Sequence, residues 1–347
     1  MTGNKKGLAA HYLQRRPALI FYLFVLAALA VLSLTIGKYP LSFKDIADVI
    51  IHTVAPSSAQ PDAMAQNVIW NIRLPRILLA LLVGASLAAA GATYQGIFRN
   101  PLVSPDILGV SAGASLGAIL GLFLYLPVVT VQILSFCGGL LTVAAVYSLG
   151  LAIRNRDPVL VLVLAGIAIG ALVGAAISLL KILADPYDQL PAITYWLLGS
   201  LTAITRSDVL SVLPAFLLGL VPLMILRWRV NLLTLSDDEA KTLGVNTTIL
   251  RPLLIASATL MTAAAVSVTG IIGWIGLIIP HIARLLVGPD FRKLLPVSMI
   301  LGAGYLLIVD LLARSIATIE IPLGILTATV GAPFFIWLLA SGKRSWQ

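Results

Sequence analysis

The sequence has few of the residues that build soluble active sites or metal centres. Cysteine occurs once, as Cys137, and histidine three times at widely spaced positions. These counts exclude a disulfide framework and a thiolate metal site. The chain also has no H-E-x-x-H motif and no G-x-x-x-x-G-K-[ST] phosphate-binding loop. We therefore expect no catalytic residues, no bound metal and no cofactor in this chain, and any ATP with its Mg²⁺ to be bound by a partner chain.

Charged residues are scarce as well. They make up 11% of the 347 residues, whereas about 25% is usual in soluble proteins, and hydrophobic residues make up 59%. The mean hydropathy is +1.02. A water-soluble fold would need a more polar surface, so we predict an all-α integral membrane protein, with residues 1–347 as a single transmembrane domain in lipid. The net charge of +9 does not predict nucleic-acid binding, because the basic residues flank apolar stretches instead of forming a run.

Apolar stretches with few or no charges follow one another along the chain. They cover residues 17–37, 77–98, 107–153, 158–180, 209–226, 252–283, 294–309 and 321–342. Two of them are longer than the roughly 20 residues that cross a bilayer as a helix, and we divide them near Pro127 and Gly270. The result is about ten transmembrane helices. We expect a further segment, 189–205, to form a shorter helix at a membrane face, because Pro191 and Gly199 interrupt it.

The first stretch, 17–37, follows a basic N-terminus and resembles a secretory signal peptide. A signal-type cleavage sequence, 28–30, lies inside the apolar run rather than after it, so we expect a retained first helix. An even number of helices places both termini on one side of the membrane. Most of the 23 Lys and Arg residues fall on that side, which is therefore predicted to be cytoplasmic.

Small residues recur at four-residue intervals in three rows. The rows are Gly109, Gly113, Gly117 and Gly121; Gly166, Gly170 and Gly174; and Gly84, Ala88, Ala92 and Gly96. Small residues let helix backbones approach closely in lipid. The rows therefore predict close packing, either inside one subunit or at a pore or dimer seam.

Glycine and proline also show a weak internal match. Gly91, Pro101 and Gly109 have the same spacing as Gly270, Pro280 and Gly288. The two segments run in opposite directions across the predicted membrane, which is the arrangement of an inverted repeat in a transporter. A chance match in a glycine-rich chain is the alternative.

One carboxylate, Asp310, lies in an apolar stretch, and Arg314 follows it one helical turn later. An ionisable residue at membrane depth often belongs to a transport pathway or a proton relay. A local ion pair with Arg314 near the helix end is the structural alternative. A single such carboxylate argues against an ion-coupled transporter, which usually needs more.

The segment 236–244 has the pattern of a short helix between two spans. It begins with a capping box and acidic residues and ends at a glycine, Gly244. Leu235, Ala240 and Leu243 offer it an apolar side. The segment is either an ordinary loop helix or a docking element for a cytoplasmic partner.

Several separated motifs resemble those of one family. They are RLPR at 73–76, GIFRNPLVSPDILG at 96–109, GLIIPH at 276–281, DLLAR at 310–314, and the glycine- and proline-containing segment 322–333. In this order and at these distances they are similar to the FecCD-type permeases, which include vitamin B12, haem and ferric-siderophore importers. The resemblance extends over residues 17–341, nearly the whole chain.

The resemblance implies the permease subunit of a type II ATP-binding-cassette importer in the bacterial plasma (inner) membrane. The expected partners are a second permease subunit, most simply a second copy, two ATPase subunits and an extracytoplasmic substrate-binding protein. The cargo would be a metal chelate: a ferric siderophore or other iron complex first, with haem, cobalamin and molybdate also open. An ion-coupled secondary transporter and a membrane-embedded enzyme are the competing interpretations, and the sequence shows no catalytic cluster for the second.

The resemblance also implies roles for individual residues. Arg73, Arg76 and Arg314, which lie on the predicted outer side against the positive-inside trend, would dock the binding protein, and anchoring to lipid headgroups is the alternative. The ATPase coupling helix, about 235–245, would comprise Leu235, Ser236, Asp237, Asp238, Glu239, Ala240, Lys241, Leu243 and Gly244. Asn100, Pro101 and Leu102 would line the cytoplasmic gate together with Val159 and Leu160, where some relatives carry small hydroxyl residues.

Overall fold

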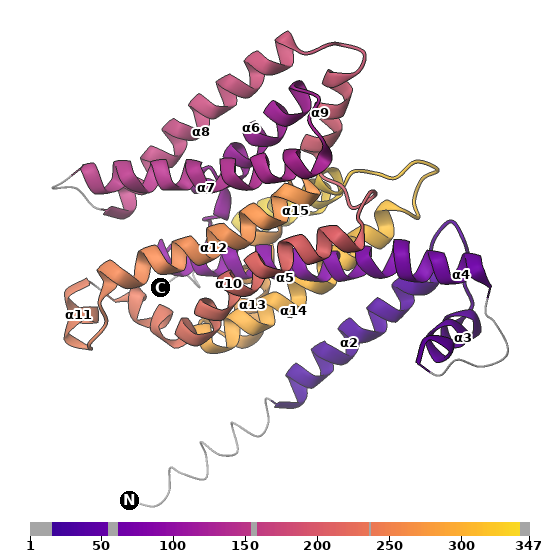
Figure 1. The fold of residues 1–347 in the computed structure, drawn as a ribbon. Coiled ribbons are helices and arrows are strands. Elements are labelled where there is room, and N and C mark those ends of the chain that lie inside the picture. Colours follow the sequence, from indigo (N-terminus) through magenta and orange to yellow (C-terminus); the bar gives the residue numbers. More distant parts are fainter. Residues whose placement is uncertain (1–15, 55–61, 154–157, 236, 341–347) are drawn as a thin grey trace, which may run out of the picture.

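The computed structural model describes residues 16–54, 62–153, 158–235 and 237–340. Helices make up the whole secondary structure of these residues (Figure 1). The α-helices are α2 (Arg16–Thr35), α3 (Phe43–Val54), α4 (Ala63–Asn67), α5 (Leu74–Ile97), α6 (Val110–Phe123), α7 (Val128–Ala152), α8 (Pro158–Leu183), α9 (Gln189–Leu198), α10 (Arg206–Val230), α11 (Asp237–Thr242), α12 (Thr247–Thr269), α13 (Ile275–Val287), α14 (Phe291–Ala313) and α15 (Leu323–Ala340). Short helical turns are η1 (Val68–Arg73), η2 (Pro105–Leu108) and η3 (Asn231–Thr234).

The helices have the length and composition of membrane spans, as expected. Within the described residues, 6 helical segments are long and apolar enough to cross a bilayer: Ala63–Ile97, Val128–Ala152, Pro158–Leu183, Arg206–Thr234, Thr247–Thr269 and Phe291–Ala313. Shorter apolar helices are Leu19–Thr35, Val110–Phe123, Ile275–Val287 and Leu323–Leu338, each of 10–17 residues. The count of ten spans stays a prediction, because the shorter helices fall below the usual spanning length.

The expected breaks in the long apolar stretches are confirmed. Pro127 is the N-cap of α7, and α6 ends at Phe123. Gly270 ends α12 with a φ of 70°, a conformation that a residue with a side chain adopts only with strain. The predicted membrane-face helix in 189–205 is α9, which ends at Gly199.

Helix α5 lies at the centre of the bundle, packed against α12, α13 and α14. Gly84 lies against the backbone of Gly302 and Gly91 against that of Gly276, and a methyl group at either position would overlap a carbonyl oxygen. Two helices can approach this closely only where neither carries a side chain. The predicted row on α5 therefore packs within the subunit.

The two other rows differ from each other. Gly113 and Gly117 of α6 lie against the backbone of α7, so this row also packs inside the subunit. Gly166 of α8 lies against the carbonyl of Ile107, but Gly170 and Gly174 have no atom of the described chain within 4 Å of an added methyl group. Of the six long apolar segments, α8 is the least buried, at 17% of its most apolar stretch. Its open face suits a second subunit or lipid.

The spacing match does not correspond to equivalent local structures. Gly91 lies inside α5, whereas Gly270 ends α12. Pro101 lies in a turn, whereas Pro280 is inside α13. Gly109 and Gly288 share a positive φ but stand at the start of one helix and the end of another. These positions give no support for an inverted repeat.

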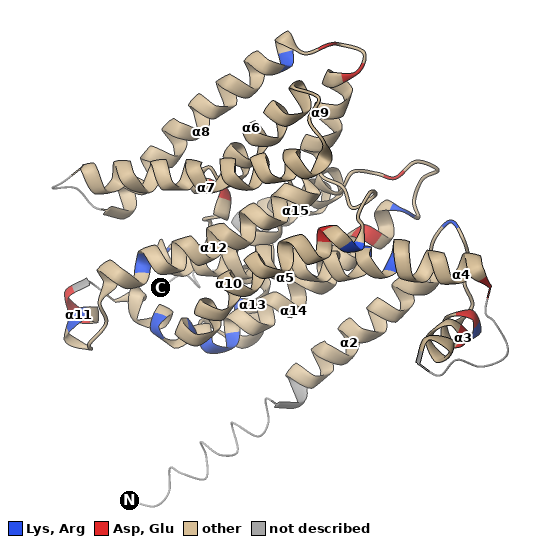
Figure 2. Ribbon diagram, in the orientation of Figure 1, with Lys and Arg blue, Asp and Glu red and all other residues tan. Residues whose placement is uncertain are grey.

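Charged residues gather toward the two ends of the helices, as Figure 2 shows. One end carries α11 and the loop between α13 and α14, and the opposite end carries α3 and α4 (Figures 1 and 2). The apolar segments between these ends match the hydrocarbon region of a bilayer. We refer to the two ends as the α11 end and the α3 end.

Candidate functional site

Six side chains at the α3 end, five of them charged, form a group linked directly or through the end of α2, and we call it the outer cluster: Arg73, Arg76, Thr202, Asp310, Arg314 and Glu320. Its centre is Arg76 of α5. The Nε of Arg76 donates to Oδ1 of Asp310 at 2.8 Å, and its Nη atoms donate to both oxygens of Glu320 at 3.1 and 2.9 Å. One guanidinium thus holds α5 to α14 and to the loop before α15.

The two other arginines of the outer cluster bind the end of α2. Arg314 donates to the carbonyls of Ile36 at 2.9 Å and Ser33 at 3.0 Å, and Arg73 donates to those of Leu34 and Tyr39. The Nε of Arg314 also lies 3.5 Å from Oδ2 of Asp310. The local ion pair that the sequence offered as one alternative for Asp310 and Arg314 is therefore present.

Four of the six members of the outer cluster are buried within this one chain, whereas Glu320 is partly exposed and Thr202 is exposed. The exposed fractions of Arg73, Arg76 and Arg314 are 4%, 7% and 8%, and that of Asp310 is 0%. The structure brings the three arginines predicted for docking together, yet their guanidinium groups point to partners in the same chain. Docking through these arginines stays a prediction. It requires the cluster to rearrange, or the binding protein to contact only the small exposed part of the arginines.

Glu320 and Thr202 are the two members of the outer cluster that sequence reasoning missed, and Glu320 is the charged one. The Oε2 of Glu320 also accepts a hydrogen bond from the hydroxyl of Thr202 at 2.8 Å. This bond connects the loop between α9 and α10 to the outer cluster. Burial alone would raise the pKa of Glu320, but the hydrogen bonds from Arg76 and Thr202 and the charge of Arg76 lower it overall. The signal in the sequence was its isolation: no acidic residue follows Glu320.

The predicted coupling segment does contain a helix, α11, between η3 and α12. It ends in a Schellman motif, in which Val245 N–H donates to the Ala240 carbonyl at 3.0 Å and Gly244 N–H to the Lys241 carbonyl at 2.9 Å. Gly244 has a φ of 81°, as expected for a helix C-terminus. Ser236, half of the predicted capping box, lies outside the described residues.

The two faces of α11 differ in exposure. Ala240 is fully buried, whereas Leu243, in the turn directly after α11, is 58% exposed. Asp238 and Lys241 also face solvent and lie 3.6 Å apart. An exposed leucine that directly follows a short helix with charged residues is a physically suitable contact for another protein.

The predicted gate residues come from two separate segments. Asn100 makes a tight turn, in which its side-chain oxygen accepts from Leu102 N–H at 2.9 Å. Val159 and Leu160 lie near the start of α8, and Leu160 is 55% exposed. Helix α8 contacts the region after Asn100 further along, where Gly166 packs on Ile107. Nothing in these contacts tests a gate formed by both segments.

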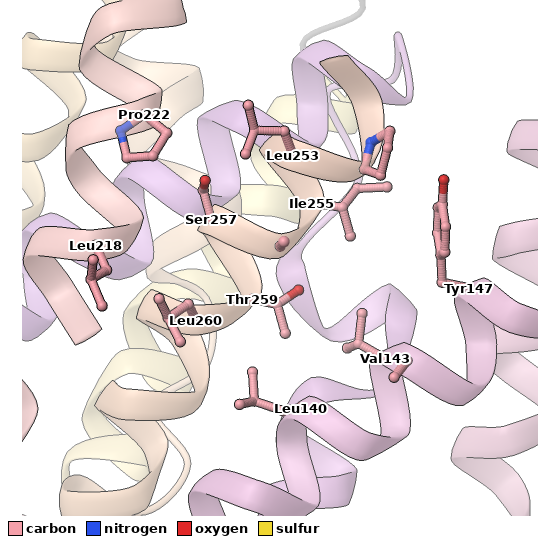
Figure 3. Close-up of a pocket in the computed structure, with 13 residues that line it drawn as sticks. Leu140, Val143, Tyr147, Leu218, Pro222, Leu253, Ile255, Ser257, Thr259 and Leu260 are labelled. Carbon is pink, nitrogen blue, oxygen red and sulfur yellow. The ribbon is translucent and has the colours of Figure 1, made fainter. Parts of the chain in front are cut away.

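An apolar cavity of about 470 Å³ lies between α7, α10 and α12 (Figure 3). Figure 3 labels Leu140, Val143, Tyr147, Leu218, Pro222, Leu253, Ile255, Ser257, Thr259 and Leu260 around it. Aliphatic side chains dominate, and Thr259 bonds Tyr94 at 2.8 Å. The cavity suits hydrocarbon better than a hydrophilic cargo, so we do not assign it to transport.

Comparisons with known proteins agree with this architecture. The profile of the FecCD transport family matches residues 25–341. The chain is 41% identical to the molybdate import system permease protein MolB of Haemophilus influenzae over 94% of this chain and 97% of that protein. It is 42% identical to an iron chelatin transport system permease protein of Helicobacter pylori (strain 26695), over 90% and 94%. A solved metal-chelate type ABC transporter in an inward-facing conformation matches with a TM-score of 0.84 and 40% identity, covering 94% of this chain and 99% of that one.

Proposed function

Because this chain belongs to the FecCD transport family, we propose that it carries a metal chelate inward as the permease subunit of an ATP-binding-cassette importer. Permeases of this family are multi-pass transport subunits, and separate subunits hydrolyse the ATP. The observation that carries the proposal is the match of nearly the whole chain, in sequence and in fold, to metal-chelate permeases. An ion-coupled secondary transporter is not favoured by these comparisons.

We assign an iron complex, such as a ferric siderophore, as the first candidate cargo. Relatives named for iron chelatin, hemin and Fe(3+) dicitrate support it. Molybdate and cobalamin are the next candidate cargoes, because other relatives of similar sequence identity are named for their import. The binding protein would make the selection, since the described helices carry few charged groups at membrane depth.

The proposed assembly contains two copies of this chain, two ATPase subunits and one extracytoplasmic binding protein. The open face of α8, with Gly170 and Gly174, supports contact with a second copy. The exposed Leu243, directly after α11, supports contact with the ATPase. ATP binding would move α11 and alternate the access of the central pathway between the two sides, with Asn100, Pro101, Leu102, Val159 and Leu160 proposed as its inner gate.

The proposed orientation puts the α11 end in the cytoplasm and the outer cluster outside, in the inner membrane of a bacterium, with ten spans and both termini inside. Arg73, Arg76 and Arg314 remain the proposed docking region for acidic residues of the binding protein. The position of the outer cluster, on the end opposite α11, supports this role.

Reconstitution tests the proposal. Vesicles are prepared with this chain in the membrane, its ATPase and ATP inside, and its binding protein with a ferric chelate outside. They should accumulate the ferric chelate. A partner ATPase whose phosphate-loop lysine is replaced should abolish uptake and leave assembly intact. Uptake by this chain alone, driven by an ion gradient, would show a secondary transporter instead.

A further inference from the structure

A second, more polar cavity lies at the α11 end, between the ends of α5 and α10, the helix α13 and the start of α14. Its volume is about 730 Å³. It is lined by Ala92, Gln95, Gly96, Arg99, Asn100, Pro101, Val230, Asn231, Thr234, His281, Arg284, Leu285, Pro289, Phe291 and Leu294. This cavity is distinct from the apolar one of Figure 3 and shares no residue with it.

The charge of the lining is of one sign. The described residues of the lining include Arg99 and Arg284, and none of these described residues is Asp or Glu. Arg284 is half-buried and makes one hydrogen bond, from its Nη2 to the side-chain oxygen of Gln95 at 3.0 Å. Among the described residues no carboxylate pairs with it. A partly desolvated guanidinium with remaining N–H donors and no counter-charge attracts an anion.

Gln95 holds Arg284 in place. Its side chain is 3% exposed, and its amide nitrogen donates to the carbonyls of Leu277 at 3.2 Å and Gly276 at 3.4 Å. These bonds fix which end of the amide faces Arg284, so the amide oxygen accepts from the guanidinium. Gly276 is itself packed against Gly91 of α5. The arginine is thus positioned by the rigid centre of the bundle.

Arg99 adds a second positive charge at the rim. It has a φ of 50°, unusual for a residue with a side chain. Its Nε donates to the carbonyl of Leu233 at 2.6 Å, and an Nη donates to that of Leu235. These bonds hold the guanidinium of Arg99 at the rim of the cavity.

We propose that this cavity binds a small oxyanion, with Arg284 as the direct ligand and Arg99 at its rim. Planar guanidinium groups bind the oxygens of phosphate, molybdate or carboxylate groups through paired, charge-assisted hydrogen bonds. The volume admits a free oxyanion or a small polycarboxylate such as citrate. The site lies at the α11 end and shares no residue with the outer cluster.

Calorimetric titration of the purified, detergent-solubilised chain tests the site. Sodium molybdate, phosphate and citrate are the probes, at constant ionic strength set by chloride. At least one should bind saturably to the wild type. R284Q should weaken that binding about tenfold to a hundredfold, as expected for loss of a charged hydrogen bond. R229Q is the matched control, because Arg229 is exposed, lies against Trp228, and changes the net charge equally.

A second variant covers the case in which R284Q does not fold. Thr234 is exposed at the rim, so T234E should fold while placing a carboxylate beside the arginines and abolishing binding. Comparison of the three probes separates a free inorganic oxyanion from a polycarboxylate. Absence of saturable binding by every probe, wild-type binding in T234E, or equal losses in R284Q and R229Q would each overturn the proposal. None of these results affects the permease proposal, which the uptake experiment tests separately.

Discussion

Arg76 of α5 and Asp310 of α14 form an ion pair of 2.8 Å, with side-chain exposed fractions of 8% and 0%. The same guanidinium binds Glu320 at 2.9 Å. The carboxylates of Asp310 and Glu320 take the hydrogen bonds of the Arg76 guanidinium that water would otherwise accept. This pairing therefore stabilises one arrangement of α5, α14 and the loop before α15. Any model of docking at the outer face has to include this internal pairing.

Removing the guanidinium of Arg76 should destabilise the chain strongly. R76Q leaves Asp310 buried with only the longer contact to Arg314, and breaking one side of a buried pair costs about 3–5 kcal/mol. The measurement is the apparent melting temperature of the purified protein in detergent. The control is R206Q, which loses an exposed bond to the Trp70 carbonyl and should change stability by no more than about 0.5 kcal/mol. Equal melting temperatures for R76Q and wild type would contradict the importance of this pair.

The stability of the outer cluster should depend on pH through Glu320. Because the folded chain lowers the pKa of Glu320 below 4.5, its charge stabilises the fold above that pH, and this contribution is lost as the pH falls through the lower folded value. E320Q should be less stable than wild type at neutral pH, and the difference should shrink in acid. Melting temperatures of both proteins across this range give the test, and a difference that grows in acid would show the opposite sign.

Two glycine substitutions should have opposite results. G91A places a methyl group onto the backbone of Gly276 and should cost about 1–3 kcal/mol. G170A meets no described atom within 4 Å and replaces a flexible helical residue, so the isolated chain should be unchanged or more stable by up to about 1 kcal/mol. Thermal unfolding compares them. If G170A instead reduces the amount of permease dimer, its face is a subunit contact.

Helix α11 should recruit the ATPase through its exposed end. Truncating the 58% exposed Leu243 to alanine should reduce co-purification of the ATPase while the chain remains folded and membrane-inserted. Ile249→Ala is the matched control, because Ile249 is 64% exposed on the neighbouring α12. Normal recruitment by L243A, or equal losses in both variants, would remove the coupling role from α11.

Much of the architecture was predictable from local patterns. A helix satisfies its own backbone hydrogen bonds, so long apolar stretches in lipid must be helical. Pro127 and Gly270 mark helix ends for reasons of backbone geometry, and Gly244 ends α11 for the same reason. The glycines whose spacing suggested an inverted repeat do not occupy equivalent local structures, because Gly91 lies inside α5 and Gly270 ends α12, and the repeat itself stays a prediction.

The sequence by itself determined the solvent, the secondary structure and the family, because these depend on composition, local geometry and ordered motifs. Only the tertiary structure decided which charges meet. Arg76 and Glu320 are 244 positions apart in the chain, and Gln95 and Arg284 are 189 apart. Their pairing depends on how closely α5 approaches α13 and α14, which the facing glycines allow. A list of charged residues contains no such distances, since the free energy of an ion pair is set by separation and burial.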